Sequence, residues 1–332
     1  MRVEVGVGLQ TDKEPGEYAR LARIAEAGGV DVVSVFGDLL YQPPIVALLE
    51  MAHATERVRL GASCWNPYTL HPYEIAGQVA ALDRISNGRA YIGLARGAWL
   101  GQLGLTQPRA VDHLRDAVDV IRSLLTGDPN GSRGAIFPLA AGTTLRYATS
   151  GRMPPVLIGA WGPKAAALAG ELADEIKVGG SANADFLDVM RGRLGPGCAR
   201  AGRSLDDIRI VFGAVTVVDE NGEAARALAR HEVAMYLAVV AELDPTVSID
   251  PRLVAHIGHL VAGGHTDRAA ELIDDDVLDR FAFAGDPTQV ADHAQRLIDA
   301  GAGRVDFGTP HGLTPERGLE LLTREVIPRL RR

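Results

Sequence analysis

Short apolar segments typical of strands alternate with helix-like segments over the first third of the chain. The strand-like segments are 2–9, 30–36, 58–64 and 90–95. Residues 30–36 are apolar almost throughout, as in a strand that is covered on both faces of a parallel sheet. Residues 45–54 and 72–84 lie between strands and space their apolar side chains as a helix does. Four such strands in about 100 residues predict a parallel α/β fold.

The rest of the chain completes the pattern and adds one long helical segment. Further strands are predicted at 155–159, 175–178, 208–218 and 304–307. Eight strands with intervening helices predict a (β/α)8 TIM barrel in which residues 1–332 form a single domain. Residues 222–280 are helical in pattern but too long for one return to the sheet. We therefore expect a helical insertion after the seventh strand, at the top of the barrel.

The first strand alternates bulky and bare positions. Val5 and Val7 alternate with Gly6 and Gly8. If the valines face the helices, the glycines leave space inside the barrel. That space suits either a large flat ligand or the side chains of neighbouring strands.

Composition restricts what the chain binds. The net charge is −8, from 34 basic and 42 acidic residues, which argues against a broad nucleic-acid or anionic-membrane surface. Cys64 and Cys198 lack metal-like spacing, and we expect neither a disulfide scaffold nor a metal site. No apolar run approaches the ~20 residues that span a membrane, and no signal-peptide pattern is present. We expect a cytoplasmic protein that acts on a small molecule.

Polar and aromatic residues follow the predicted third strand, where barrel enzymes place their chemistry. Residues 63–67, Ser-Cys-Trp-Asn-Pro, suit a backbone bulge against a planar ligand. Cys64 and Trp65 are types that more often pack in a core than react. Asn66, held extended by Pro67, has an amide for a ring heteroatom.

Three further strand ends have candidate residues. Arg96 and Gly97 suit an anion, or Arg96 pairs with an acidic neighbour. Asp38 is either a functional carboxylate or a turn cap. Residues 159–164, Gly-Ala-Trp-Gly-Pro-Lys, predict a helix start whose free N–H groups and Lys164 suit a phosphate. The alternative is an ordinary connection with a solvated lysine.

Together these segments resemble the luciferase-like monooxygenase superfamily. They are most similar to its branch that uses the deazaflavin coenzyme F-420, the methylenetetrahydromethanopterin reductases and their relatives. The resemblance extends over essentially the whole chain. It is clearest at residues 60–68, 81–93 with Ser-Asn-Gly-Arg, 158–174 and 285–288.

The resemblance implies where the cofactor, 8-hydroxy-5-deazaflavin, is held. Its ring would lie on a strand-three bulge with a non-prolyl cis peptide at Ser63–Cys64. Asn66, Arg96 and Gly97 would contact the ring or ribityl chain. The residues implied at the ribityl and phosphate end are Trp161, Gly162, Lys164 and Ala165. The resemblance also implies an insertion after strand seven and a homodimer.

Three positions depart from the resembled branch. Gly37 and Asp38 occupy the place of an Asp-His pair, Gly8 that of a glutamate in the reductases, and Ala98 that of a glutamate in sugar-phosphate dehydrogenases. The cofactor expectation survives these changes. The named reactions of those relatives do not follow.

We therefore expect an F-420-dependent oxidoreductase that transfers a hydride between C5 of the deazaflavin and a C=C, C=N or C=O bond of a small substrate. Asp38 is the expected proton donor, and Gln10 and Trp65 are expected to face the substrate. The alternatives are a two-component monooxygenase that uses FMN, a non-catalytic deazaflavin-binding protein, and a barrel that binds nothing.

Overall fold

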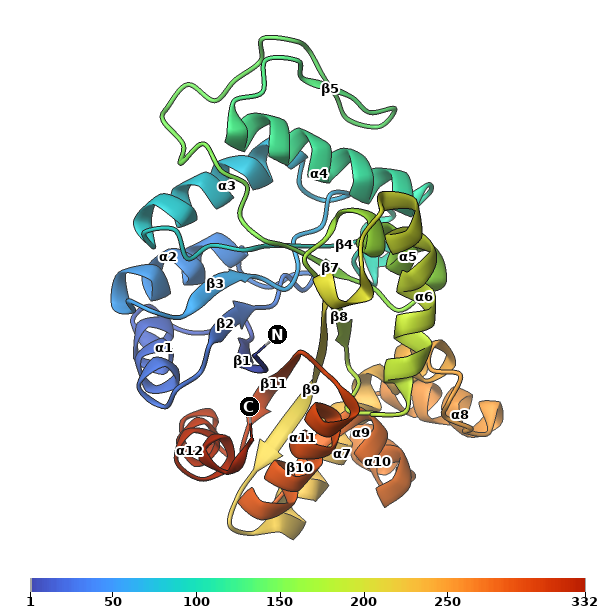
Figure 1. The fold of residues 1–332 in the computed structure, drawn as a ribbon. Helices are drawn as coiled ribbons and strands as arrows, with labels where there is room; N and C mark the ends of the chain where they lie inside the picture. Colours follow the sequence, from blue (N-terminus) through green and yellow to red (C-terminus); the bar gives the residue numbers. More distant parts are fainter. Residues whose placement is uncertain (1, 332) are drawn as a thin grey trace.

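Eight parallel strands form a barrel in residues 2–331, which the computed structural model describes, and helices surround it (Figure 1). The strand order is β3-β2-β1-β11-β9-β8-β7-β4. Two further bridges, Leu60 to Ala90 and Trp65 to Leu94, join β3 to β4 and close the ring. The predicted TIM barrel is confirmed. The barrel strands are β1 (Glu4–Leu9), β2 (Val32–Val35), β3 (Arg59–Ala62), β4 (Ile92–Ala95), β7 (Val156–Gly159), β8 (Glu175–Gly179), β9 (Arg209–Val218) and β11 (Arg304–His311).

Helices cover the outside of the barrel. Outward residues such as Val5, Val7 and Leu9 of β1 are buried against them in the main core. The helices are α1 (Glu17–Ala27), α2 (Pro44–Ala54), α3 (Pro72–Ile85), α4 (Ala110–Thr126), α5 (Pro163–Leu172), α6 (Phe186–Ala201), α11 (Pro287–Ala300) and α12 (Pro315–Leu321). The shorter turns are η1 (Leu100–Leu103), η2 (Leu205–Asp207), η4 (Leu322–Val326) and η5 (Ile327–Arg329). Among the described residues no helix has the length and apolar character needed to cross a membrane.

The two glycines of β1 leave space that neighbouring side chains fill. A Cβ on Gly6 would lie 2.0 Å from Oδ1 of Asp306, and one on Gly8 would lie 2.6 Å from the ring of Phe36. Side chains from the adjacent strands, not a ligand, therefore occupy the inner side of β1. This decides between the two interpretations of the alternating pattern.

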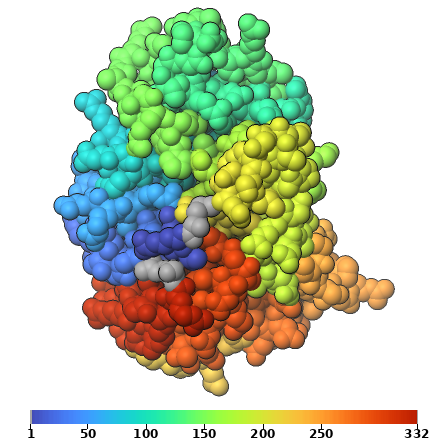
Figure 2. Space-filling model, in the orientation of Figure 1, coloured from blue at the N-terminus to red at the C-terminus, as the bar shows by residue number. Residues whose placement is uncertain are grey.

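The segment after β9 is helical, as predicted, and has its own small core. Its elements are α7 (Gly222–Val240), η3 (Ala241–Leu243), α8 (Pro251–Ala262), α9 (Thr266–Ala270) and α10 (Asp275–Phe281). Buried residues such as Leu237, Ile257 and Phe281 pack together there, apart from the main core. The segment around α8 projects from the side of the molecule (Figure 2). Tyr236 and Val240 pack beside Gly180, which follows β8.

Short strands also form outside the eight strands of the barrel. Strand β10 (Ala282–Gly285) follows the insertion and pairs in parallel with the end of β9, although no strand was predicted there. Its four residues are buried, but a run this short between a helix and a turn has no clear strand pattern. In the connection between α4 and β7, a short antiparallel hairpin pairs β5 (Ser132–Arg133) with β6 (Pro138–Leu139).

Helices α5 and α6 pack closely enough to require glycine at their contact. A Cβ on Gly197 would lie 1.7 Å from the carbonyl oxygen of Ala167. Gly197→Ala is therefore expected to lower the free energy of unfolding by about 2 kcal/mol, because the helices must move apart. Gly192→Ala in the same helix is the control, since a Cβ there meets nothing within 4 Å. It should stabilise by about 0.5–1 kcal/mol through helix propensity. Urea unfolding measures both, and equal midpoints would contradict the close contact.

Candidate active site at the barrel mouth

Parallel strands end on one side of the barrel, and this brings the predicted site residues together. Gln10, Asp38, Ser63, Arg96 and Trp161 closely follow the ends of β1, β2, β3, β4 and β7. We call the face that these five residues mark the barrel mouth. Barrel enzymes place their reacting groups at this end.

The end of β3 forms a tightly packed bulge. The peptide bond between Ser63 and Cys64 is cis, as the resemblance implied. A Cβ on Gly37 would lie 2.2 Å from the carbonyl oxygen of Cys64, so only glycine fits at position 37. On the other side, Sγ of Cys64 lies 3.0 Å from the place of a Cβ on Gly159. Desolvation raises the pKa of the Cys64 thiol to about 11, so the group is protonated at neutral pH and is a poor nucleophile.

Trp65 lies in the core, and the expectation that it faces a substrate is corrected. Its side chain is 2% exposed, and its indole N–H donates to Oε1 of Gln78 at 3.0 Å. Its backbone joins β3 to β4, because its N–H donates to Gly93 at 2.8 Å and its carbonyl accepts from Ala95 at 3.1 Å. The backbone of Trp65 therefore helps to close the barrel, while its side chain packs in the core.

Asn66 and Gly97 meet at the mouth between β3 and β4. Oδ1 of Asn66 accepts the backbone N–H of Tyr68 at 2.8 Å, which fixes the orientation of the amide. The Nδ2 atom then lies 2.0 Å from the place of a Cβ on Gly97. Gly97 also has a positive φ of 77°, so glycine is required there for two reasons. Gln107 donates to the Gly97 carbonyl at 3.1 Å and holds this loop, and Arg96 is exposed beside it.

Gln10 and Asp38 form a polar pair across the ends of β1 and β2. Oε1 of Gln10 accepts the backbone N–H of Thr11 at 2.9 Å, so the amide group must point its Nε2 away from Thr11. Nε2 donates to Oδ2 of Asp38 at 2.9 Å. Partial desolvation raises the pKa of Asp38, while the bond from Gln10 opposes that change. The structure thus brings together the two residues expected near a substrate and leaves the second carboxyl oxygen for a proton.

The N-terminus of α5 provides an anion-binding arrangement at the end of β7. Gly162 is extended, Pro163 takes the first helical position, and the exposed Lys164 lies in the first turn. The first N–H groups of a helix lack partners within it and attract anions. Trp161 is half-buried, and its indole N–H donates to the carbonyl of Gly179 at 3.0 Å, which ties this loop to β8. Ala165 is also half-buried.

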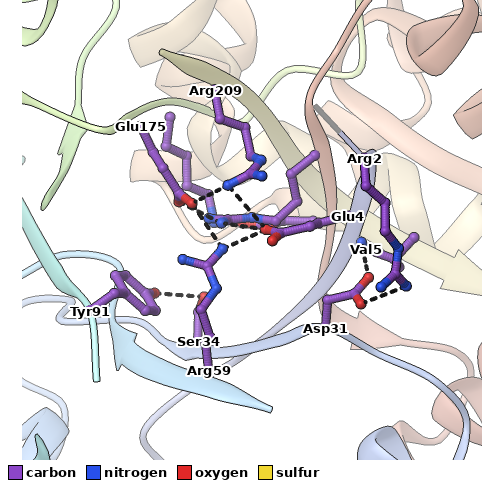
Figure 3. A network of polar contacts seen from close by, with 12 residues as sticks. Arg2, Glu4, Val5, Asp31, Ser34, Arg59, Tyr91, Glu175 and Arg209 are labelled. Carbon is purple, nitrogen blue, oxygen red and sulfur yellow. Dashed lines mark hydrogen bonds and ion pairs between the residues drawn. The ribbon is translucent and has the colours of Figure 1, made fainter. Parts of the chain in front are cut away.

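Charged side chains fill the barrel below the mouth (Figure 3). Arg304 is fully buried and donates to Glu175 and, at 2.8 Å, to Asp306. Glu175 also pairs with Arg59 at 2.8 Å and with Arg209 at 3.0 Å. Burial raises the pKa of Glu175, but the neighbouring arginines outweigh it and lower the pKa to about 2. The carboxylate is therefore ionised and links its own strand, β8, to the three strands β3, β9 and β11.

A second buried pair lies in the same barrel and was not predicted. Nζ of Lys177 lies 2.8 Å from Oδ2 of Asp306, and both side chains are almost fully buried. A sequence pattern does indicate them. Glu175 and Lys177 alternate with apolar residues on one strand, and Arg304 and Asp306 do the same on another. Charges two residues apart on a strand share one face, so such strands have a polar face inside the barrel.

The packing around positions 8 and 37 explains why this chain has glycine where the resembled branch has other residues. At position 8, Phe36 occupies the space that a larger residue would need. At position 37, the carbonyl of Cys64 excludes any side chain. Ala98 is half-buried after β4 and has no titratable group. Asp38 is thus the carboxylate that remains at these positions.

Comparison with known proteins identifies the family. A family model described as luciferase-like monooxygenase matches residues 1–304. The chain belongs to the luciferase-like monooxygenase family. This luciferase-like chain is similar to 5,10-methylenetetrahydromethanopterin reductase from Methanopyrus kandleri, with 30% identity over 98% of each chain. F-420-dependent glucose-6-phosphate dehydrogenase from Nakamurella multipartita is 29% identical over 96% of this chain and 93% of its own.

Solved structures agree with this luciferase-like assignment. The coenzyme F-420-dependent tetrahydromethanopterin reductase from Methanopyrus kandleri superposes with a TM-score of 0.90 at 28% identity, covering all of both chains. An F-420-dependent secondary alcohol dehydrogenase, solved with an F-420-acetone adduct, has a TM-score of 0.82 at 21% identity over both full chains. The latter likeness shows the shared barrel fold.

Proposed function

We propose that this luciferase-like chain is an oxidoreductase that depends on the deazaflavin coenzyme F-420. The end-to-end match to the F-420-dependent tetrahydromethanopterin reductase, at a TM-score of 0.90, carries this proposal. When bound, the deazaflavin supplies or accepts a hydride at C5. The protein positions it against a C=C, C=N or C=O bond of a small substrate and supplies the proton.

The residues at the mouth fit this cofactor. A flat ring placed on the Ser63–Cys64 bulge would adjoin Asn66, Arg96 and Gly97. A Cβ on Gly162 or Gly179 would meet nothing within 4 Å, so there is open space at the ends of β7 and β8. The helix start then offers backbone N–H groups and a cation to a phosphate. The residues proposed for that end are Trp161, Gly162, Lys164 and Ala165.

Asp38 is the proposed proton donor, and Gln10 orients it. Gln10 holds one carboxyl oxygen, and the raised pKa favours the protonated acid compared with an ordinary aspartate. The substrates named for the relatives are not carried over. Gly8, Gly37 and Ala98 carry no titratable group where the resembled enzymes would handle protons, so Asp38 is the acid that this chain keeps at these positions.

Absorbance titration of the purified protein with coenzyme F-420 and with FMN tests the proposal. Saturable binding of the deazaflavin, with weaker or no binding of FMN, is the expected result. Binding of FMN alone would overturn the cofactor assignment, and oxygen consumption with reduced FMN would favour a monooxygenase. Tight deazaflavin binding without turnover on a broad acceptor panel would favour a binding protein.

We further propose that the protein is a cytoplasmic homodimer. Val46 on α2 and Tyr73 on the neighbouring α3 are 53% and 51% exposed, and apolar side chains of this size support a contact between copies. Light scattering coupled to size exclusion measures the mass. A mass of one chain of 35.2 kDa at micromolar concentration would contradict the dimer.

A further inference from the structure

Lys177 is a buried cation one layer below the barrel mouth. Its Nζ lies 2.8 Å from Asp306 and 5.9 Å from the centre of the Phe36 ring. Its strand pairs with β7 in a register that sets Lys177 beside Gly159, and Gly159 is the residue against which Cys64 packs. The amine therefore lies close beneath the Ser63–Cys64 bulge.

Glycines on neighbouring strands clear the space for this ion pair. A Cβ on Gly213 would lie 2.8 Å from Cε of Lys177 and 3.2 Å from Cβ of Asp306. A Cβ on Gly6 would lie 2.0 Å from a carboxylate oxygen of Asp306. The barrel thus accommodates a long charged side chain pointing inward, where a smaller apolar residue would otherwise fill the volume.

The buried charged groups around Asp306 carry more positive than negative charge. Asp306 is shared between Lys177 and the fully buried Arg304, so two cations face one carboxylate. Arg304, Arg59 and Arg209 in turn share Glu175 and Glu4, so the whole network holds four cations, counting Lys177, against three carboxylates. Two buried titratable groups beside this charged network do not add negative charge. Desolvation raises the pKa of both the Cys64 thiol and the Tyr91 phenol, which are therefore neutral.

An unbalanced charge in a low-dielectric interior stabilises an anion placed near it. At the mouth, Asp38 lies near the Cys64 thiol, and desolvation raises its pKa. The charged and titratable groups that interact directly with Lys177 are Asp306, its ion-pair partner, and the Cys64 thiol, while Arg304 reaches it through the shared Asp306. An anionic ring above the bulge would supply the missing counter-charge.

We infer that Lys177 stabilises negative charge on the ring of the bound deazaflavin and so favours the ionised form of its 8-hydroxyl group. This inference rests on the proposed function. The hydroxyl is phenol-like, and on ionisation its charge spreads over the conjugated ring. A fixed cation below the ring lowers the free energy of that anion without forming a bond to it.

The absorbance of the bound chromophore, followed against pH, tests this inference. In the wild-type complex the apparent pKa of the 8-hydroxyl is expected to be lower than that of free coenzyme by about one pH unit. An unshifted or raised value in the wild-type complex would overturn the inference. This measurement needs no variant, and it does not use activity.

Variants assign the effect to Lys177. Lys177→Gln keeps a hydrogen-bond donor for Asp306 but removes the charge, so the apparent pKa of the bound ring should rise by about one unit. Lys177→Arg keeps the charge and should retain the wild-type value. Lys164→Met removes the same charge from the proposed phosphate end, and it should weaken binding without moving the ring ionisation. Circular dichroism verifies that each variant is folded.

The outcomes separate the inference from the proposed function. If no spectral change follows mixing with coenzyme F-420, the proposed function fails. If the coenzyme binds and Lys177→Gln leaves its ionisation unchanged, the proposed function stands and the role of Lys177 is refuted. An equal shift in Lys164→Met would also refute it, because the effect would then follow net charge alone.

Discussion

Glu175→Gln is expected to lower the free energy of unfolding by about 3–5 kcal/mol, the usual cost of removing one partner from a buried ion pair. Arg304 is 0% exposed and would keep only Asp306 and the more distant Glu4 as counter-charges. Arg59 and Arg209 would lose the same carboxylate. Urea unfolding followed by circular dichroism measures the change.

A matched control separates this buried network from ordinary surface pairs. Glu171 also accepts from two arginines, Arg115 and Arg200, but both lie at the surface with side chains 42% and 57% exposed. Glu171→Gln should therefore cost no more than about 1 kcal/mol. If the two variants unfold at the same urea concentration, the interior network does not stabilise the barrel as described.

The same carboxylate predicts how stability depends on pH. The folded-state pKa of Glu175 is lowered from 4.5 to about 2. A lowered carboxyl pKa adds stability above the unfolded value, and that stability is lost as the pH falls from 4.5 toward 2. The full effect corresponds to about 3 kcal/mol. Glu175→Gln should flatten this part of the acid-unfolding curve, and an unchanged curve would contradict the assignment.

Asp38→Asn is expected to reduce turnover about 100-fold, within the usual range for loss of a general acid. Asparagine has the size of aspartate, and its side-chain oxygen can still accept the hydrogen bond from Gln10. Affinity for the cofactor should therefore not change. Asp12→Asn is the control, because Asp12 is a half-exposed carboxylate in the loop after β1 that pairs with Lys13. Steady-state kinetics with a substrate found by screening gives kcat and KM for each.

The pH profile distinguishes a proton donor from a structural role. Desolvation raises the pKa of Asp38, and an acid must be protonated to donate. The rate of substrate reduction should therefore fall as the pH rises through that raised pKa, and the reverse reaction should show the opposite limb. In Asp38→Asn this limb should vanish. A variant that keeps both the wild-type rate and its pH profile would exclude Asp38 as the donor.

Local pattern was sufficient to predict the barrel and much of its mouth. Apolar strands followed by helices occur in order along the chain, and parallel strands must all end on one side. Residues after strand ends therefore gather at one face whatever the details of packing. This is why Gln10 and Asp38 could be predicted to lie near each other although 28 positions separate them.

Only the tertiary structure decided which side chains meet inside the barrel. The alternation of Glu175 with Lys177 gives their shared face, but their partners Arg304 and Asp306 lie 129 positions along the chain. Trp65 follows a strand end like its neighbours, yet its indole turns into the core toward Gln78. A period of two fixes the face of a strand and not the distant residue that fills the space opposite it. That pairing depends on strand order and register, which are properties of the closed barrel.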